Sequence, residues 1–209
     1  SVPIQLASSL ISRLKVMAGM DIAQHQKPQD GHIEFPYEKR LIDIRTSSMP
    51  TIHGELMVCR FMNIDEGLLR IGELGFSVPN EQRFLSLIHK PAGLVIVCAP
   101  VNNGKTTTLY AAMQELNQPE YNLVTLEDPV EHTLAGINQV QLNPRGGLDY
   151  VEGLKSLLRQ DTDQILLGEI RSTETAEMAV RIALTGHLLL TTLHTEDSAA
   201  VIFRLREMG

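Results

Sequence analysis

The 209-residue sequence lacks several features that define common protein classes. It has no tryptophan and only 4% aromatic residues, so it offers few rings on which the bases of a single-stranded nucleic acid would stack. Its formal net charge of −7 argues against a generally basic surface for binding phosphate backbones. We therefore expect no nucleic-acid partner.

Cysteines and long apolar runs are also scarce. The two cysteines, Cys59 and Cys98, lie in separate apolar runs and are expected to be reduced, buried thiols, neither a disulfide nor a metal site. No apolar run approaches the roughly 20 residues that a membrane span needs, and no signal-peptide pattern opens the sequence. These absences favour a cytoplasmic protein, with one good domain and a smaller unit, that is able to dock on a membrane complex.

The central feature of the sequence is the segment LVIVCAPVNNGKTTTLY at 94–110. Residues 94–98 are apolar and rich in β-branched side chains, as expected of a buried parallel strand. Gly104, Lys105 and Thr106 follow, and apolar residues then recur at helical spacing. This is the context of a phosphate-binding loop, in which a lysine reaches the β and γ oxygens and a hydroxyl reaches Mg²⁺. An ordinary strand–helix turn with an exposed lysine is the alternative.

The pattern of elements changes along the chain. An amphipathic helix over 4–20 and three strand-like runs form a thin first unit over 1–62, which we expect to be part of a larger domain. A connector over 63–90 leads to alternating strands and helices over 91–209, which predict an α/β fold with a parallel sheet. The expected strands are 32–35, 41–47, 55–61, 94–98, 122–126, 137–142, 165–167 and 188–193, and the later helices are 79–89, 105–116, 150–159, 174–184 and 197–207.

Carboxylates follow two of the expected parallel strands. Glu127 and Asp128 end one strand, and Glu169 follows the other. Open α/β sheets bind ligands at this end of their strands, so Glu127 or Glu169 is a candidate for orienting an attacking water, and Glu169 also for holding Mg²⁺ through water. A solvated acidic turn is the alternative for Glu127. His187 and His194 stand at the two ends of one strand, so their roles must differ.

Five segments together resemble the ATPases of type II secretion and type IV pilus assembly, the GspE/PilB family. They are IDIRTSSMPTIHGE (42–55), GKTTTLY (104–110), VTLEDPVEHTLAGINQVQLNP (124–144), LRQDTDQILLGEIR (158–171) and ALTGHLLLTTLHT (183–195). The resemblance implies a truncated RecA-like P-loop ATPase core over 91–209, preceded over 1–62 by the C-terminal part of a PAS-like domain. It also implies a homohexamer that hydrolyses ATP with Mg²⁺, peripheral to the inner membrane, and acts on secretion or pilus platform proteins there.

The resemblance, carried over by matching position, also implies roles for particular residues. Nucleotide binding is expected of Asn102, Asn103, Gly104, Lys105, Thr106 and Thr107, and Mg²⁺ binding of Thr106 and Glu169. Catalytic roles are expected of Glu127, Glu169, His187, His194, Arg45 and Arg60. The two arginines resemble fingers that neutralise charge on γ-phosphate oxygens, whereas alone they read as solvated charges on strands. The segment MPTIHGE at 49–55 resembles the assembly branch of the family.

The loop departs from the family pattern GPTGSGKT, because it reads APVNNGKT. Ala99 replaces a glycine and would be strained at a positive φ. Asn102 replaces another glycine, and asparagine tolerates the left-handed region better than most residues. We expect the loop to form and to bind ATP more weakly than is usual in the family. Two functions stay open: an ATP-hydrolysing motor, and a ring subunit without efficient turnover that acts by binding partners.

Overall fold

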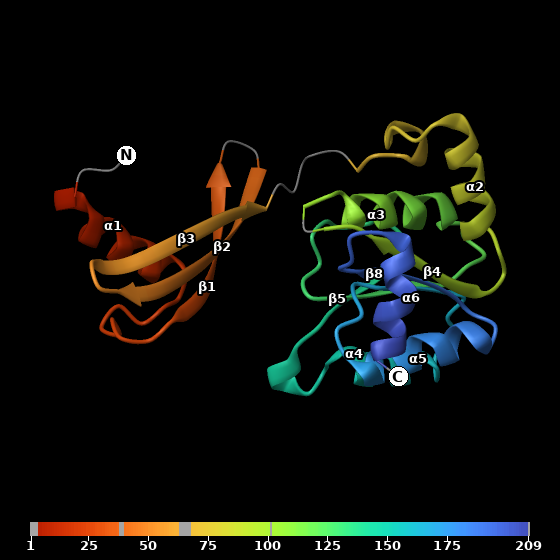
Figure 1. The fold of residues 1–209 in the computed structure, drawn as a ribbon. Coiled ribbons are helices and arrows are strands. Elements are labelled where there is room, and N and C mark those ends of the chain that lie inside the picture. The colour runs from red at the N-terminus through yellow and green to blue at the C-terminus, as the bar shows by residue number, and fades with distance from the viewer. Residues whose placement is uncertain (1–3, 38–39, 63–67, 101, 209) are drawn as a thin grey trace. The chain divides into compact units, whose positions relative to one another are not determined.

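The chain divides into two compact units, Ser1–Glu66 and Gly67–Gly209 (Figure 1). The structure, a computed structural model, describes residues 4–37, 40–62, 68–100 and 102–208. No helix within these ranges is both long and apolar enough to cross a membrane. Each unit has its own hydrophobic core.

The first unit is a three-stranded antiparallel sheet with one helix packed on it (Figure 1). Strand β2 (Arg40–Thr51) pairs with β1 (Gln29–Tyr37) on one side and with β3 (Gly54–Met62) on the other. Helix α1 (Ile4–Met17) covers the inner face, where side chains from alternate strand positions point. The buried core is small, in agreement with the thin unit expected from the sequence, and consists of Ala18, Met20, Ile33 and Ile44.

A buried ion pair fastens α1 to the sheet. Lys15 is 0% exposed, forms an ion pair with Glu55, and donates a hydrogen bond of 2.8 Å to the carbonyl of Gln24. His25 Nδ1 lies 2.9 Å from the second Glu55 oxygen. The hydrogen bonds from Lys15 and His25 lower the pKa of Glu55. Because a buried charge without its partner is strongly destabilising, this pair fixes the end of α1 against the β2–β3 hairpin.

The second unit is a five-stranded sheet with strand order β4-β8-β7-β5-β6, and all neighbouring strands are parallel. The predicted α/β class is therefore confirmed. All five carboxyl ends lie along one edge of the sheet, which is the edge at which such sheets bind ligands. The strands are β4 (Gly93–Cys98), β5 (Leu123–Glu127), β6 (Asn138–Gln141), β7 (Gln164–Leu167) and β8 (Leu188–Leu193).

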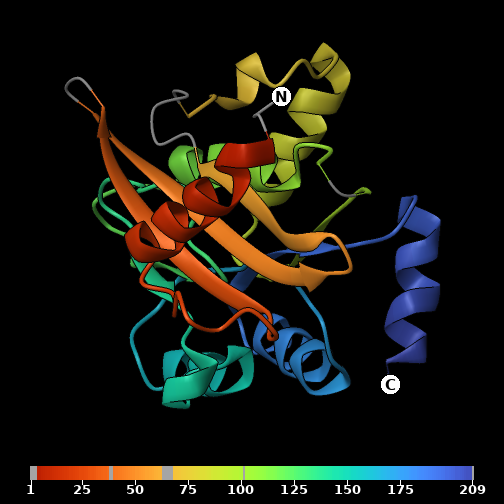
Figure 2. The same ribbon diagram turned by 90° about the vertical axis from the view of Figure 1, so that its left-hand side faces the viewer.

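Helices cover both faces of this sheet (Figures 1 and 2). On one face, α3 (Lys105–Leu116) packs with η1 (Ile71–Glu73) and α2 (Val78–Ile88) in a shared core. On the other face, a second core joins the sheet to three further helices. Strands β5 and β8 are buried throughout, as is typical of parallel strands covered on both faces. The remaining helices are η2 (Pro144–Gly146), α4 (Tyr150–Leu157), α5 (Thr173–Leu184) and α6 (Ser198–Glu207).

The end of the first helix, the connector and the two cysteines differ in part from what the sequence predicts. The first helix ends at Met17 and not at residue 20, because Gly19 turns the chain with a φ of 67°. Residues 68–90 of the expected connector contribute Ile71 and Ile88 to the core of the second unit, whereas 63–67 lie outside the described residues. The two cysteines are free, as expected, but both are half-buried and not buried.

Candidate nucleotide-binding site

The loop between β4 and α3 has the geometry of an anion-binding site. Lys105, the first residue of α3, is 8% exposed, and its ammonium donates to the carbonyl oxygens of Ala99 at 2.9 Å and Pro100 at 2.8 Å. Gly104 precedes the helix in the left-handed conformation, with a φ of 73°, and has no side chain to cap it. The first N–H groups of a helix have no intrahelical acceptor, so those of α3 are left to bind an anion.

The two substituted positions of this loop behave differently. Asn102 adopts a φ of 62° and is the one non-glycine residue with a positive φ in the described part of the chain. This agrees with the expectation that asparagine accepts the left-handed region. The φ of Ala99 is not positive, so the strain that a positive value would cause there does not arise. Ala99 therefore fits the loop without backbone strain.

Glu127 is buried and both of its oxygens are engaged. It ends β5 and is 3% exposed. One oxygen accepts from the Thr125 hydroxyl at 2.5 Å and from Gln139 Nε2 at 3.2 Å, and the other accepts from the Tyr110 hydroxyl. Burial and the neighbouring Glu127 raise the pKa of Tyr110, so the hydroxyl stays protonated and donates. Glu127 thus fastens the helix that follows the phosphate loop to strand β5.

Glu169 is the more accessible carboxylate, with 18% of its side chain exposed. It lies just after β7. Arg171 holds one oxygen through Nε at 2.7 Å and also lies 3.3 Å from Asp128. His194, just after β8, approaches the other Glu169 oxygen with its Nε2 at 3.3 Å. Residues that follow β5, β7 and β8 therefore form one charged cluster at the carboxyl edge of the sheet.

The two histidines lie at opposite edges of the sheet. His194 joins the charged cluster, whereas His187 precedes β8, and its carbonyl accepts from Gly93 N–H at 3.1 Å. Seven residue steps along an extended strand separate them by about 20 Å. Of the expected site residues in the second unit, Lys105, Glu127, Glu169 and His194 thus meet at one edge, and His187 does not.

Arg45 and Arg60 belong to the first unit. They are direct partners across the antiparallel strands β2 and β3, and both lie on the face opposite the buried Ile44. Neither side chain has a hydrogen bond or ion pair with another described residue. Like charges placed opposite each other in a sheet are unfavourable, so this pair favours a bound anion.

Within the described ranges, no group of three or more histidine, cysteine and carboxylate side chains is able to hold a metal ion. Mg²⁺ needs no such cage, because it retains waters and phosphate oxygens and takes only one or two protein ligands. Thr106 occupies the second position of α3, beside the free helix N-terminus, and Glu169 stands at the same edge of the sheet. These two oxygen donors fit Mg²⁺ bound together with a phosphate.

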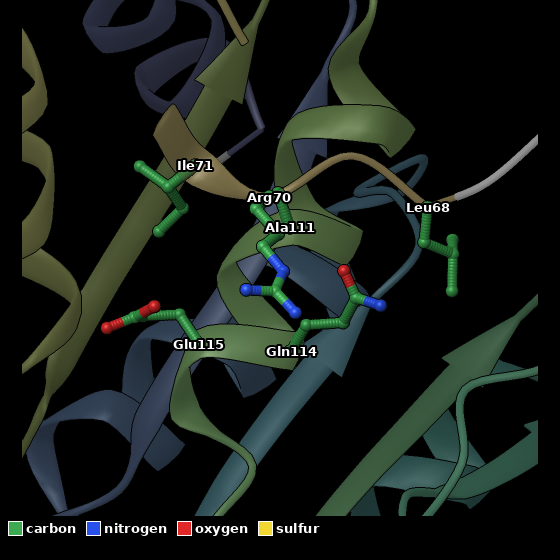
Figure 3. A pocket seen from close by; sticks show the side chains of 6 residues that line it. All are labelled: Leu68, Arg70, Ile71, Ala111, Gln114 and Glu115. Atoms are coloured by element: carbon green, nitrogen blue, oxygen red, sulfur yellow. The ribbon is translucent and has the colours of Figure 1, made fainter. Parts of the chain in front are cut away.

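A groove of about 510 Å³ lies along the outer side of α3 (Figure 3). Leu68, Ile71 and Ala111 provide apolar walls, and the Arg70 guanidinium lies over the helix near Gln114 (Figure 3). The amide oxygen of Gln114 is buried and has no hydrogen-bond partner among the described residues. A buried unpaired acceptor is costly, so the groove favours a ligand with a hydrogen-bond donor.

Three further side chains belong to this site, and no pattern in the sequence pointed to them: Tyr110, Arg171 and Tyr150. Tyr110 lies 17 residues from Glu127, and no spacing rule brings a helical residue to a strand end at that distance. Arg171 follows Glu169 by two positions, but the sequence does not show that its guanidinium pairs with both Glu169 and Asp128. Tyr150 contacts the site only because α4 begins beneath the ends of β5 and β7.

The fold and this site define a nucleotide-binding α/β unit of the phosphate-loop type. The family described as "Type II/IV secretion system protein" matches residues 1–209, and the chain belongs to this family. The chain is 46% identical over 205 residues to the type II secretion system ATPase E of Vibrio cholerae, which covers 98% of the chain and 41% of that protein. It is 45% identical over 208 residues to the type IV pilus assembly ATPase PilB of Pseudomonas aeruginosa, which covers 99% of the chain and 37% of that protein.

A solved structure of the pilus retraction motor PilT with bound ADP is also similar. It superposes with a TM-score of 0.71 and 28% identity, over 86% of this chain and 52% of that chain. The chain spans about two-fifths of the length of the curated relatives it matches. The family expected from the sequence is confirmed.

Proposed function

We propose that the protein is a motor subunit that hydrolyses ATP to power pilus or pseudopilus assembly, or protein secretion, on the cytoplasmic side of the inner membrane. The observation that carries the proposal is the meeting of the phosphate-loop geometry of Lys105 with Glu169 and His194 at one sheet edge. Membership of a family whose relatives are named secretion and pilus ATPases supports it.

Glu169 is the group that orients the attacking water. Strand β8 lies between β4 and β7, so the phosphate loop and Glu169 are two strand spacings apart, about 10 Å. That gap accommodates a γ-phosphate and a water in line with it. Lys105 exchanges two loop carbonyls for phosphate oxygens, and His194 stands between the two groups to contact the γ-phosphate. Thr106, and Glu169 through a water, would hold Mg²⁺, which would supply positive charge beside the phosphate oxygens.

Glu127 has a positioning role. A general base needs an oxygen directed at the proton it abstracts, and both oxygens of Glu127 are occupied by donors from Tyr110, Thr125 and Gln139. Its burial further separates it from an incoming water. Of the two carboxylates left open by the sequence, we therefore assign the water to Glu169.

The nucleobase occupies the groove along α3. Thr107, Ala111 and Gln114 recur at helical spacing and so share one face of α3. Ala111 follows Lys105 by six residues, a rise of about 9 Å along the helix, which is close to the span from the β-phosphate to the base. The buried Gln114 oxygen then accepts from a base amino group, and Arg70 lies over the ring.

The arginine pair of the first unit serves as the finger onto the nucleotide. Arg45 and Arg60 bring two guanidinium groups to one patch, which suits the charge spread over γ-phosphate oxygens. In a homohexamer, a neighbouring subunit supplies this patch. The second unit then acts as a RecA-like core and the first as the end of a PAS-like domain, with secretion or pilus platform proteins as partners. His187 lies at the opposite edge of the sheet from the charged cluster, so its role differs from that of His194.

A ring subunit without efficient turnover is the second candidate, and the conformation of Asn102 is the observation that favours it. A side chain at a φ of 62° occupies a position where glycine carries no steric cost. The unstrained backbone of Ala99 weakens this alternative, since only one of the two substitutions then disturbs the loop.

The test compares wild type with Glu169→Gln and with Glu177→Gln, a matched control on the exposed side of α5. MgADP affinity and phosphate release are measured over a range of protein concentrations, because a finger from a neighbour requires assembly. We expect Glu169→Gln to keep MgADP affinity and to lose about a hundredfold or more in phosphate release. The Glu177→Gln variant should match wild type in both measurements.

Equal phosphate release by wild type and Glu169→Gln would refute the motor. Loss of MgADP binding in Lys105→Ala is required as well, because Lys105 carries the phosphate contact. If Asn102→Gly raised turnover severalfold from a negligible wild-type rate, the ring subunit without efficient turnover would replace the motor as the conclusion.

A further inference from the structure

The Tyr150 hydroxyl lies at the carboxyl edge of the sheet, between the ends of β5 and β7. Tyr150 is the first residue of α4, which is capped by Asp149, and it is 8% exposed. Its ring belongs to the core beneath the sheet. A Cβ placed on Gly168 would lie 2.9 Å from the Tyr150 hydroxyl and 3.3 Å from the carbonyl of Leu126. The missing side chain of Gly168, the residue before Glu169, therefore leaves room for this hydroxyl.

The hydroxyl stands among the charges of the proposed active site. Burial raises the pKa of Tyr150 most, followed by the charge of Glu169, with smaller influences of Arg171, Asp128 and Glu127. The phenol is therefore protonated at neutral pH and is a donor. It has no hydrogen bond to another described residue and is not one of the fully buried unpaired polar atoms, so it is reached by water and is available to a new acceptor.

We propose that Tyr150 is a positioning residue for hydrolysis, a role that rests on the proposed function. Its hydroxyl donates to the Glu169 carboxylate, directly or through one water, when Glu169 turns from Arg171 toward the water at the γ-phosphate. Arg171 leaves without losing its charge partner, because Asp128 lies 3.3 Å from its guanidinium. Tyr150 supplies the replacement donor, so the carboxylate keeps a fixed orientation during the reaction.

The test is Tyr150→Phe, which keeps the ring and removes only the hydroxyl. Tyr121→Phe is the matched control, since Tyr121 is 47% exposed in the same unit. We expect Tyr150→Phe to lower kcat about tenfold, near the lower end of the range for one hydrogen bond to a charged group. KM for ATP, MgADP affinity and the thermal midpoint should stay close to wild type, because the ring still fills its place in the core.

A double-mutant cycle with Glu169→Gln separates positioning from packing. If the hydroxyl acts through Glu169, adding Tyr150→Phe to Glu169→Gln should cause no further loss of kcat. An unchanged kcat in Tyr150→Phe, or a full tenfold loss that persists in the Glu169→Gln background, would overturn the inference. A loss of MgADP affinity equal to the loss of kcat would also overturn it, because it would indicate damage to binding.

Gly168→Ala provides a second route to the same hydroxyl. The added methyl displaces the Tyr150 hydroxyl, so kcat should fall as in Tyr150→Phe. The kcat of the double variant Gly168→Ala/Tyr150→Phe should be no lower than that of Gly168→Ala alone. A double variant that loses kcat additively contradicts the proposal. If Glu169→Gln itself hydrolysed ATP like wild type, the proposed function would be refuted. A low kcat in Glu169→Gln together with a wild-type kcat in Tyr150→Phe would refute only the role of Tyr150.

Discussion

Removal of the Tyr110 hydroxyl tests whether Glu127 is a fixed positioning group. Tyr110 is 1% exposed and donates to Glu127, and its oxygen accepts from the N–H groups of Glu131 at 3.1 Å and His132 at 3.5 Å. In Tyr110→Phe the buried carboxylate loses a donor, which costs about 1.5–3 kcal/mol for a hydrogen bond to a charged group. The Glu131 N–H loses its acceptor, which adds about 1 kcal/mol. We expect a total loss of about 2.5–4 kcal/mol.

The assay is urea unfolding followed by circular dichroism, because the chain has no tryptophan and the signal then reports on the helices. Tyr121→Phe is again the control, and its exposed hydroxyl should change the free energy of unfolding by no more than about 0.5 kcal/mol. A loss of about 2.5–4 kcal/mol is a large share of the total stability of a domain, about 5–15 kcal/mol, so the two variants should separate clearly.

A loss below about 1 kcal/mol in Tyr110→Phe would refute the reasoning, because it would mean that the hydroxyl contributes little to holding the carboxylate. Glu127 would then again be a candidate for orienting the water. The cycle with Glu127→Gln sharpens the result. Since the two groups are in contact, their effects should be non-additive by about 0.5–3 kcal/mol. Additive effects would show that the two side chains do not act together.

Three further predictions concern the loop and the first unit. Asn102→Gly should tighten MgADP binding about two- to fivefold, because glycine adopts a positive φ without strain. Ala99→Gly should leave the MgADP affinity within about twofold of wild type. Equal gains in affinity for the two variants in titration calorimetry would contradict this prediction. Gly31→Ala should destabilise the first unit by about 1–3 kcal/mol, because the new Cβ would lie 2.5 Å from the carbonyl oxygen of Ala18; a neutral result in urea unfolding would show that the strand shifts freely. The folded pKa of Glu55 is lowered, so its contribution is complete above the unfolded pKa and is lost as the pH falls through the folded value. The unfolding free energy should therefore fall more steeply in this acidic range in wild type than in Glu55→Gln.

Much of the second unit follows from local sequence patterns. Apolar runs such as 94–98 and 188–193 alternate with helical periodicity, and only parallel strands covered on both faces satisfy that order. Once the strands are parallel, residues that follow them share one edge. This is why the phosphate loop, Glu169 and His194, which each follow a parallel strand, lie along the same edge of the sheet.

Other features depended on contacts that the linear order does not contain. Glu127 and Glu169 stand at the ends of neighbouring strands, and the sequence makes both of them candidates for orienting the attacking water. Tertiary packing places Tyr110 and Gln139 against Glu127 and leaves Glu169 at 18% exposure, so their roles separate. The cross-strand pairing of Arg45 likewise arises from the register of β2 and β3, which the spacing of the chain does not specify.

The sequence by itself determined the family, the parallel sheet and the edge at which the proposed site lies, because strand and loop signals are local and repeat along the chain. The tertiary structure decided which carboxylate is more accessible, that Tyr110 links the phosphate-loop helix to β5, and that Tyr150 reaches the same edge from beneath the sheet. The physical reason is that burial and hydrogen-bond partners come from residues far apart in the chain, and only packing brings them together.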